Sequence, residues 1–356
     1  MPDEQIDSLF RQPVCWLMDN GPEDDIAISS RIRLARNLSG EPFPIRSDDA
    51  TLGGIRDSVF SALGKVDSMK DSNTSVFRVD ELSELDRRFL LERHLISREF
   101  LNPRHGSGLV TNREQGAFVM INEEDHLRLQ VLAPGFQLNE IWQQINRLDD
   151  ELSVQLPFAF DKTFGYLTSC PTNLGTGMRA SVMMFLPALT QGGYMDALAT
   201  QLSKIGLTVR GLFGEGSGGA GCMYQISNQI TLGVSESEIL AKLTEAVKQI
   251  HESEMQARKN IGEDALDRLT DRVMRSVGIL KNAYMIGTEE FIKLFCDVRL
   301  GISKGIVRGI DYEQLGTLLV EAMPATLTLS SESTPKGEAA RDKLRASRIK
   351  ALLDVT

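Results

Sequence analysis

Two adjacent carboxylates, Glu123 and Glu124, follow a segment that predicts a strand, residues 116–121, after the single residue Asn122, and are the first candidates for chemistry. At the end of a strand, a bend can turn both side chains toward one pocket. Such a pair suits a guanidine substrate, which stays protonated and unreactive until a carboxylate orients it and accepts its proton. Taken alone, an exposed acidic loop is the more common explanation of two adjacent glutamates.

Five arginines could supply the complementary charge, because they lie in otherwise apolar or glycine-rich segments: Arg31, Arg33, Arg128, Arg179 and Arg210. Arg31 and Arg33 alternate with apolar residues and would share one face of a strand over residues 26–37. Guanidinium groups form forked hydrogen bonds with phosphate oxygens, and phosphoryl transfer depends on positioning and on stabilising spread negative charge. The set predicts a phosphate site, although each arginine by itself fits a solvated surface position.

A glycine-rich stretch offers a competing interpretation, since Gly214, Gly216 and Gly219 match the GxGxxG pattern of dinucleotide-binding folds. That pattern should run from a strand into a helix, whereas the chain continues here as a second strand, and we therefore reject it. No GxxxxGK[ST] sequence occurs, so a P-loop ATPase is not indicated either. The glycines instead predict a mobile loop that closes over a substrate.

Cys170, His94 and two arginines of the tail are weaker candidates. Cys170 could be a thiol of low pKa, although a lone cysteine is more often a small buried hydrophobe. His94 lies on a predicted helix beside apolar neighbours, where a structural role is the default. Arg341 and Arg345 are one helical turn apart and could clamp a phosphate, but a solvated amphipathic helix explains them equally.

Composition limits the possible functions. The 356 residues carry a formal charge of −10, which argues against a nucleic-acid binder with a generally basic surface. The four cysteines form no CxxC pair and the four histidines do not cluster, so neither a zinc site nor a disulfide framework is suggested. An acidic start and the lack of a long apolar run predict a cytoplasmic protein that does not insert into membranes.

The pattern of elements predicts an α+β fold. Strands are expected at residues 26–37, 116–121, 127–132, 207–213 and 223–232, and helices from Ser83, over 141–156 and from Ser235. Because several strands follow one another through short connections, the sheet should be largely antiparallel. Helical patterns dominate beyond residue 260 and end in a polar linker, 330–335, and a charged helix from Gly337. We therefore expect a short segment at 1–25, a catalytic domain at 26–256 and a helical domain at 260–356.

Three of these stretches also resemble the signatures of the phosphagen (guanidino) kinases: Ser29-Ser30-Arg31-Ile32-Arg33, Asn122-Glu123-Glu124-Asp125-His126-Leu127-Arg128, and Cys170 to Ala180 with its Asn173-Leu174-Gly175-Thr176-Gly177 core. The chain is more similar still to the bacterial protein arginine kinases. Only about 25 residues precede the first motif, which leaves no room for the helical N-terminal domain of the small-molecule kinases. In addition, Arg341-Asp342-Lys343-Leu344-Arg345-Ala346 fits the RDxxRA phosphoarginine-binding motif of the bacterial enzymes.

The resemblance implies a role for each matching position. It implies that Glu123 and Glu124 hold and deprotonate the guanidinium and that Cys170 lies beside the substrate. The implied ATP site comprises Ser29, Ser30, Arg31, Ile32, Arg33, His94, Arg128, Arg179, Ala180, Ser181, Val182, Met183, Arg210, Gly211, Leu212, Phe213, Gly214 and Glu215. It also implies a glutamine-synthetase-like antiparallel sheet, a helical C-terminal domain that dimerises, and Mg²⁺ bridging the nucleotide phosphates. The protein ligands of that metal stay unknown, as does which glutamate is the base.

The predicted activity is transfer of the γ-phosphate of ATP to arginine side chains of proteins. The resemblance further implies that the mark directs proteins to a Clp protease and that a zinc-binding activator protein is a partner. Residues 341–346 would then read phosphoarginine and regulate the enzyme. Two alternatives stay open: a kinase of free arginine or another guanidino metabolite, and a phosphoarginine-binding adaptor that has lost kinase activity.

Overall fold

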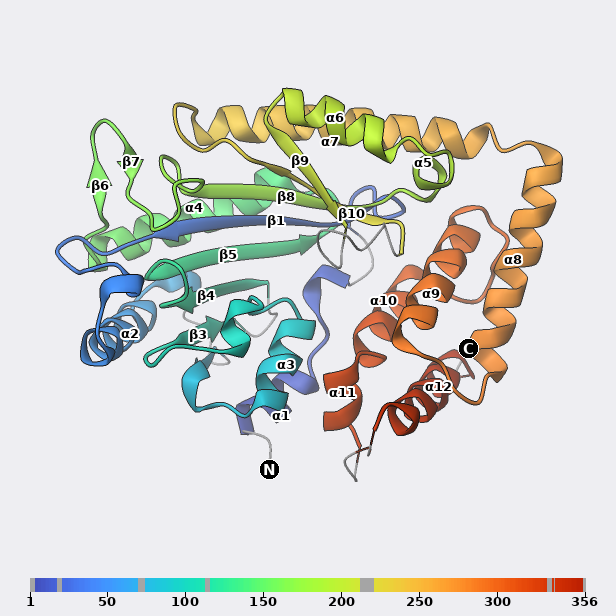
Figure 1. The fold of residues 1–356 in the computed structure, drawn as a ribbon, viewed down its shortest axis with the longest axis horizontal. Coiled ribbons are helices and arrows are strands. Elements are labelled where there is room, and N and C mark those ends of the chain that lie inside the picture. The colour runs from blue at the N-terminus through green and yellow to red at the C-terminus, as the bar shows by residue number, and fades with distance from the viewer. Residues whose placement is uncertain are drawn as a thin grey trace.

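The computed structural model describes residues 4–17, 21–69, 74–112, 116–211, 221–331, 335 and 337–354. Its centre is a sheet of eight strands (Figure 1). The strands are β1 (Ala27–Arg36), β2 (Ser75–Arg78), β3 (Gly108–Thr111), β4 (Ala117–Ile121), β5 (Leu127–Pro134), β8 (Met178–Phe185), β9 (Leu207–Gly211) and β10 (Met223–Asn228). They lie in the order β2-β3-β4-β5-β1-β8-β10-β9, and every neighbouring pair is antiparallel, which confirms the predicted fold class.

One face of the sheet is covered by α2 (Asp49–Leu63), α4 (Leu138–Gln155), α6 (Met195–Lys204) and α7 (Glu236–Lys259), and α5 (Pro187–Gln191) lies beside α7. Their apolar residues recur at helical spacing and pack against the inward side chains of the strands. The predicted start of α7 is confirmed by a capping box, in which the Ser235 hydroxyl accepts a hydrogen bond from the Glu238 amide and the Glu238 carboxylate accepts one from the Ser235 amide.

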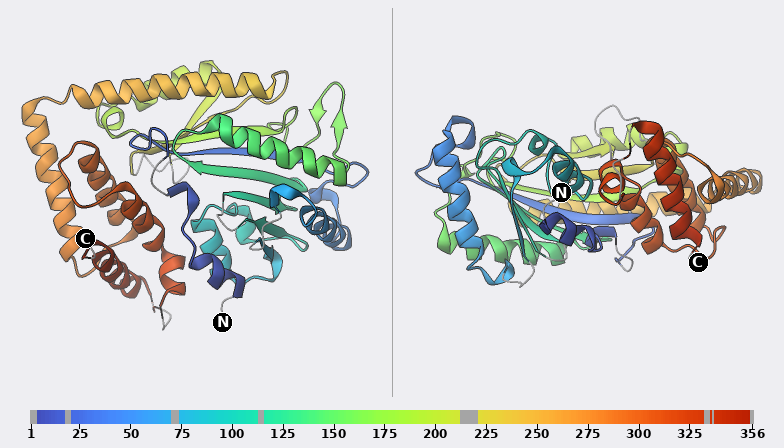
Figure 2. Two further views of the ribbon diagram at one scale, coloured as in Figure 1. Left: turned by 180° about the vertical axis from the view of Figure 1, so that it is seen from behind. Right: turned by 90° about the horizontal axis from the view of Figure 1, so that it is seen from below.

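The other face of the sheet meets α1 (Glu4–Phe10), α3 (Glu84–Glu92) and the C-terminal helices (Figures 1 and 2). These helices are α8 (Glu263–Asn282), α9 (Thr288–Ser303), α10 (Tyr312–Glu321), α11 (Pro324–Leu329) and α12 (Glu338–Asp354). They form one helical region that turns away from the end of α7 and comes back toward the sheet through α10 and α11, where α11 packs against α3 (Figure 1). The helical character predicted for this part of the chain is confirmed.

Smaller elements connect the main ones. A separate hairpin is formed by β6 (Phe160–Asp161) and β7 (Gly165–Tyr166), and 3-10 turns occur at Cys15–Leu17, Pro44–Arg46, Asp67–Met69, Val79–Glu81 and Glu99–Leu101. Of the helices in the described part of the chain, none combines the length and the apolar character that crossing a bilayer requires.

The expected elements did not include β2, β3, β8, α2 or α6, and two elements that were expected end earlier than predicted. The helix capped by Ser83 ends at Glu92, so His94 lies beyond the helix and not on it. The physical reason is that His94 adopts a left-handed backbone conformation, with φ of 61°, which an α-helix does not accommodate. The second strand of the late pair ends at Asn228 and not at residue 232, because the Asn228 side chain bonds to the Ile230 carbonyl and turns the chain.

Candidate active site

A cavity of about 520 Å³ lies on the sheet face that the C-terminal helices cover. Alternate residues of two neighbouring strands form its floor: Ser29, Arg31 and Arg33 from β1, with Arg179, Ser181 and Met183 from β8. Side chains two apart on a strand point to the same face, so the predicted common face of Arg31 and Arg33 is confirmed. Arg210 and Gly211, at the end of β9, line the cavity beside this floor.

The cavity gathers positive charge that is only partly compensated. Burial, reinforced by Arg128 and Arg179, lowers the pKa of Arg31 to about 10. Burial and the same arginines, with Arg31 added, lower the pKa of Arg33 well below its usual value. The Arg31 Nη2 donates to Gln225 Oε1 at 2.7 Å, whereas the buried Arg33 Nε has no hydrogen-bond partner in the described part of the chain. A bound polyanion would relieve this repulsion.

His94 enters the same cavity as a neutral group. Its ring meets the ring of Trp16 edge-on, with the centroids 4.7 Å apart. Burial, and then the charge of Arg31, lowers the pKa of His94 to about 4. Near pH 7 the imidazole can therefore exchange hydrogen bonds with a ligand but adds no charge.

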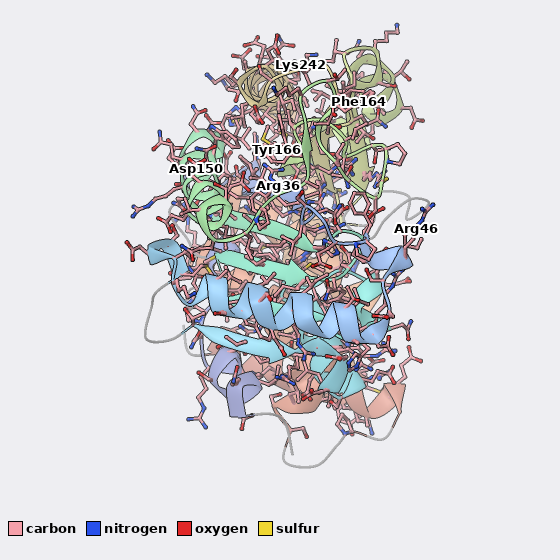
Figure 3. The ribbon with its side chains drawn as sticks, turned by 90° about the vertical axis from the view of Figure 1, so that its left-hand side faces the viewer. Arg36, Arg46, Asp150, Phe164, Tyr166 and Lys242 are labelled. Atoms are coloured by element: carbon pink, nitrogen blue, oxygen red, sulfur yellow. The ribbon has the colours of Figure 1, made fainter. Side chains whose placement is uncertain are left out.

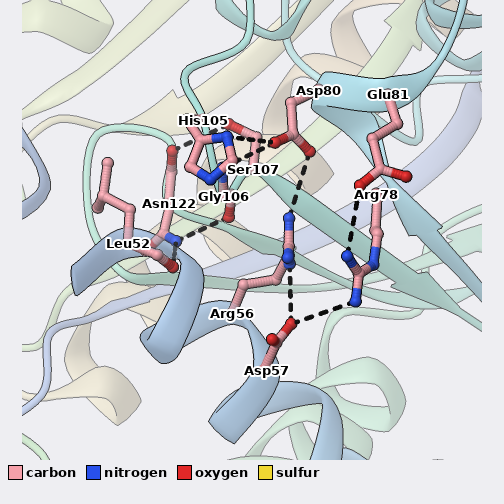
Figure 4. A network of polar contacts seen from close by, with 10 residues as sticks. All are labelled: Leu52, Arg56, Asp57, Arg78, Asp80, Glu81, His105, Gly106, Ser107 and Asn122. Carbon is pink, nitrogen blue, oxygen red and sulfur yellow. Dashed lines mark hydrogen bonds and ion pairs between the residues drawn. The ribbon is translucent and has the colours of Figure 1, made fainter. Parts of the chain in front are cut away.

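The turn that carries the two glutamates is held by Asn122, the residue after β4. Asn122 has a φ of 58°, a left-handed conformation that asparagine tolerates better than most residues. Its Nδ2 donates to the carbonyl oxygens of Leu52 and Gly106, both at 2.8 Å. Figure 4 shows that this joins a larger network, in which the Gly106 amide donates to Asp80, and Asp80 pairs with Arg56. The turn is thereby fixed to α2.

The two adjacent glutamates have different surroundings. Glu123 is buried, lies 2.6 Å from Arg128 in an ion pair, and accepts a hydrogen bond from the Ser97 hydroxyl at 2.7 Å. The Glu124 side chain is 41% exposed, and its Oε2 is 3.4 Å from Arg128. Glu123 is therefore committed to internal contacts, whereas Glu124 can meet a ligand.

A second pocket of about 120 Å³ adjoins the cavity. Its lining includes Glu124, Arg128, Thr172 and Asn173, and it shares Arg33 and Arg179 with the larger cavity. A cation in this pocket would have a carboxylate on one side and, across the shared arginines, the larger cavity on the other. That arrangement fits a guanidinium beside a bound polyphosphate.

Cys170 lies at the edge of this arrangement. Its Sγ is 3.0 Å from the Thr172 hydroxyl, and neither pocket lining formed by the described residues includes it. The preceding amide, of Ser169, donates to Asp125 Oδ1 at 2.6 Å, and Asn37 Nδ2 donates to the same oxygen at 2.6 Å. Asp125 thus joins the Cys170 segment to the turn that carries the glutamates.

Comparison with known proteins agrees with this geometry. The family model described as "ATP:guanido phosphotransferase, C-terminal catalytic domain" matches residues 55–257, and the one described as "Protein-arginine kinase McsB C-terminal domain" matches residues 266–356. A protein-arginine kinase of Halothermothrix orenii is 44% identical over 342 residues, which are 96% of each chain. The chain belongs to the protein-arginine kinase family. A further relative, from Pelotomaculum thermopropionicum, is 42% identical over 94% of each chain.

Solved structures place the fold of this kinase among those of small-molecule guanidino kinases. The duplicated taurocyamine kinase of Schistosoma mansoni, with bound transition-state analogue components, aligns with a TM-score of 0.59 and 26% identity over 72% of this chain and 36% of that one. Lombricine kinase aligns with a TM-score of 0.59 and 22% identity, over 71% and 74% of the two chains. The activity is therefore transfer of phosphate to arginine in proteins, within a fold that other members use for small guanidines.

Several positions predicted for the ATP site do not reach the cavity with their side chains. Ile32, Ala180 and Val182 belong to the hydrophobic core on the opposite face of the sheet, because they alternate with the cavity residues. Ser30 is also fully buried, and its hydroxyl donates to the Gly135 carbonyl. The predicted Leu212, Phe213, Gly214 and Glu215, with the remaining loop glycines, lie outside the described residues.

Other residues line the cavity without having been predicted. They are Trp16, Ile28, Leu91, Glu92, Arg98, Leu132, Met223, Gln225, Leu319, Val320 and Met323. Gln225 could have been found from its place on β10, two residues after Met223 on the same face. Leu319, Val320 and Met323 come from α10 and its end, and no local signal connects them with strands more than a hundred residues earlier.

The tail motif of this kinase lies on α12, in surroundings that the sequence did not indicate. Arg345 is only 1% exposed, and it donates Nε to the Ala322 carbonyl and Nη1 to the Ile286 carbonyl, at 2.8 and 2.7 Å. It also donates to Asp342 Oδ1 at 2.6 Å and to the Thr288 hydroxyl at 2.8 Å. Four of the five guanidinium N–H donors are thus engaged inside the helical region. The neighbouring Arg341 is half-buried.

Proposed function

We propose that the large cavity holds ATP, with its phosphates against Arg31, Arg33, Arg179 and Arg210, and that the small pocket holds the guanidinium of a substrate arginine. One observation carries this assignment: the two pockets share Arg33 and Arg179 as a common wall. A γ-phosphate at this wall would lie between cationic side chains and directly beside the guanidinium. Glu124 would contact the guanidinium from the opposite side.

In this arrangement Glu124 accepts one proton from the guanidinium as the freed nitrogen attacks the γ-phosphorus. A phosphorus–nitrogen bond forms, and the bond between the γ-phosphorus and the bridging oxygen breaks to release ADP. Glu123 holds Arg128 by the 2.6 Å ion pair and so orients a cation toward the transferred group. Cys170 lies outside the lining of this pocket but contacts Thr172, which belongs to it.

Mg²⁺ would supply charge neutralisation on the nucleotide phosphates. Within the described ranges, no three His, Cys, Asp or Glu side chains gather in a way that could cage a metal. This fits an ion held mainly by phosphate oxygens and water, as Mg²⁺ commonly is. The cavity arginines and the exposed carboxylate of Glu124 would then surround a metal–nucleotide complex.

We extend the proposal to regulation and partners on the strength of the family. Residues 341–346 would bind phosphoarginine: Arg341 and the one remaining N–H of Arg345 are the available donors, and Asp342, Lys343, Leu344 and Ala346 complete the motif. The kinase would act in the cytoplasm as a homodimer, with a zinc-binding activator protein, and would mark proteins for a Clp protease.

The assignment is tested by incubating the kinase with ATP and either a casein-like protein or free arginine. We expect an acid-labile, base-stable phosphate that mass spectrometry maps to arginine of the protein, and no transfer to the free amino acid. Glu124→Gln should lower kcat by about 10² to 10⁴ without weakening ATP binding, which is the usual contribution of a general base. A Glu124→Gln enzyme as active as wild type would overturn the assigned base.

A further inference from the structure

A third hollow, a groove of about 330 Å³, lies between the β6–β7 hairpin and residues 231–238. Apolar side chains line it but stay largely exposed: Phe160 is 58%, Phe164 50% and Leu232 47% exposed. Contiguous exposed apolar groups on a folded protein commonly mark a surface that binds another molecule. Figure 3 shows Phe164 and Tyr166 of the hairpin on this side of the molecule, with Arg36 close to Tyr166.

The groove has a firm floor. Tyr166 exchanges two backbone hydrogen bonds with Gly175, at 2.8 and 3.3 Å, so the hairpin is fixed to the segment that follows Cys170. The Arg36 guanidinium stacks 3.4 Å from the centre of the Tyr166 ring and donates to the Thr176 carbonyl at 3.0 Å. Arg36 is itself held by an ion pair of 2.8 Å with Asp149 on α4. The shape of the groove is therefore determined before any ligand binds.

The groove and the proposed guanidinium pocket lie on two sides of one short segment, residues 172–177. Thr172, Asn173 and Gly177 line that pocket, whereas Gly175 and Thr176, from the same short segment, line the groove. Since one residue spans at most about 3.6 Å, Asn173 and Gly175 are within about 7 Å of each other. A peptide whose arginine occupies the pocket can therefore pass around this segment and place side chains within a few residues of the arginine at the groove.

The charge of the groove also suits such a peptide. Its described lining contains the carboxylates of Glu236 and Glu238 and no lysine, arginine or histidine. A segment that carries arginine is attracted to carboxylates, and its apolar neighbours can pack against the exposed phenylalanines. A kinase of small guanidines has no substrate atoms that would need such a surface.

We propose that this groove binds the polypeptide next to the target arginine, with an apolar side chain of the substrate packed between Phe160, Phe164 and Leu232. The inference rests on the proposed position of the guanidinium. It makes the β6–β7 hairpin a determinant of which arginines are phosphorylated. The groove does not take part in the chemical step.

The test compares three substrates: a nine-residue peptide with a central arginine flanked by leucine, the same peptide flanked by serine, and acetyl-arginine amide. For the wild type we expect kcat/KM to be about tenfold higher with leucine than with serine, mainly through KM. The double variant Phe160→Ser with Phe164→Ser should lose this preference and keep its activity on acetyl-arginine amide. Val154→Ser on α4, where Val154 is 81% exposed and distant in sequence, is the matched control and should retain the preference.

Three results would overturn the proposal that the groove binds substrate. The first is equal kcat/KM of the wild type for the two peptides. The second is an unchanged preference for leucine in the double variant. The third is a double variant whose kcat/KM falls as much on acetyl-arginine amide as on the leucine peptide. A change of oligomeric state in the double variant, seen by light scattering, would show that a second copy occupies the groove and would also overturn it. Glu124→Gln tests the guanidinium pocket alone. If this variant loses activity on all three substrates, the proposed site stands even where the groove proposal fails.

Discussion

Arginines that are partly or fully withdrawn from solvent serve opposite purposes in two regions of this kinase. In the cavity, Arg31 and Arg33 lie beside further arginines, and burial together with this repulsion lowers their pKa values. In the helical region, Arg345 is buried more deeply, at 1% exposure, yet it donates to two carbonyl oxygens, a hydroxyl and a carboxylate. The first arrangement is short of negative charge, and the second is nearly satisfied.

The role of a cation withdrawn from solvent depends on how many acceptors surround it. A guanidinium with a full set of acceptors holds a structure together, because removing it would leave buried acceptors without donors. A group of guanidiniums that repel one another costs folding free energy and persists only where a ligand compensates it. The two cases can be separated by measuring activity and stability on the same variants.

The largest effect should come from Arg33→Met. This change removes the charge that lines both pockets but keeps the length of an apolar side chain. We expect kcat/KM to fall by about 10³, as when a cation that stabilises phosphoryl transfer is lost. The free energy of unfolding without nucleotide should stay equal or rise by about 1 kcal/mol, since like-charge repulsion is relieved. A clear loss of stability in urea denaturation would show that Arg33 supports the folded structure as Arg345 does, and would contradict the proposed difference between the two arginines.

Arg345→Met should behave in the opposite way. The variant leaves the Ala322 and Ile286 carbonyl oxygens without their donor, so we expect the free energy of unfolding to fall by about 3 kcal/mol. Activity measured at low temperature, where the variant is still folded, should fall much less than in Arg33→Met. If urea denaturation of Arg345→Met showed wild-type stability, the internal hydrogen bonds of Arg345 would not stabilise the fold, and the proposed difference from the cavity arginines would be wrong.

His94 provides a pH-dependent version of the same test. Its pKa is about 4 in the folded protein, below the usual 6.5, so the unfolded chain binds a proton more readily than the folded one. Stability that is present above pH 6.5 should therefore be lost as pH falls from 6.5 toward 4, by up to about 3 kcal/mol. His94→Asn, which tolerates the left-handed backbone, should show a flatter stability profile in this window. Identical profiles would exclude His94 as the source.

The smallest effect should come from Arg348→Ala, three residues after Arg345 on α12. Arg348 pairs with Glu321 at 2.7 Å, but its side chain is 42% exposed, and exposed pairs contribute little. We expect a loss of stability below about 1 kcal/mol by thermal unfolding. A loss as large as that of Arg345→Met would show that position on α12, and not burial, decides the energetics.

Local patterns were sufficient to predict much of the fold. Alternation over residues 26–37 indicated β1 and the common face of Arg31 and Arg33, and Ser235 with Glu238 marked the start of α7. The same alternation could have excluded Ile32, Ala180 and Val182 from the cavity, since they point to the opposite face. The end of α3 before His94 was missed because a left-handed residue leaves no sign in hydrophobic periodicity.

Local sequence patterns were enough for five of the eight sheet strands, for the cationic residues of β1 and, through the motifs, for the family. How those residues are used depends on the packing of the folded chain. It buried Glu123 against Arg128 while leaving Glu124 open to the small pocket, although the two are neighbours in the chain. It also brought α10 to the cavity and enclosed Arg345 among carbonyl groups. Such outcomes depend on contacts between segments far apart in sequence, which no local pattern encodes.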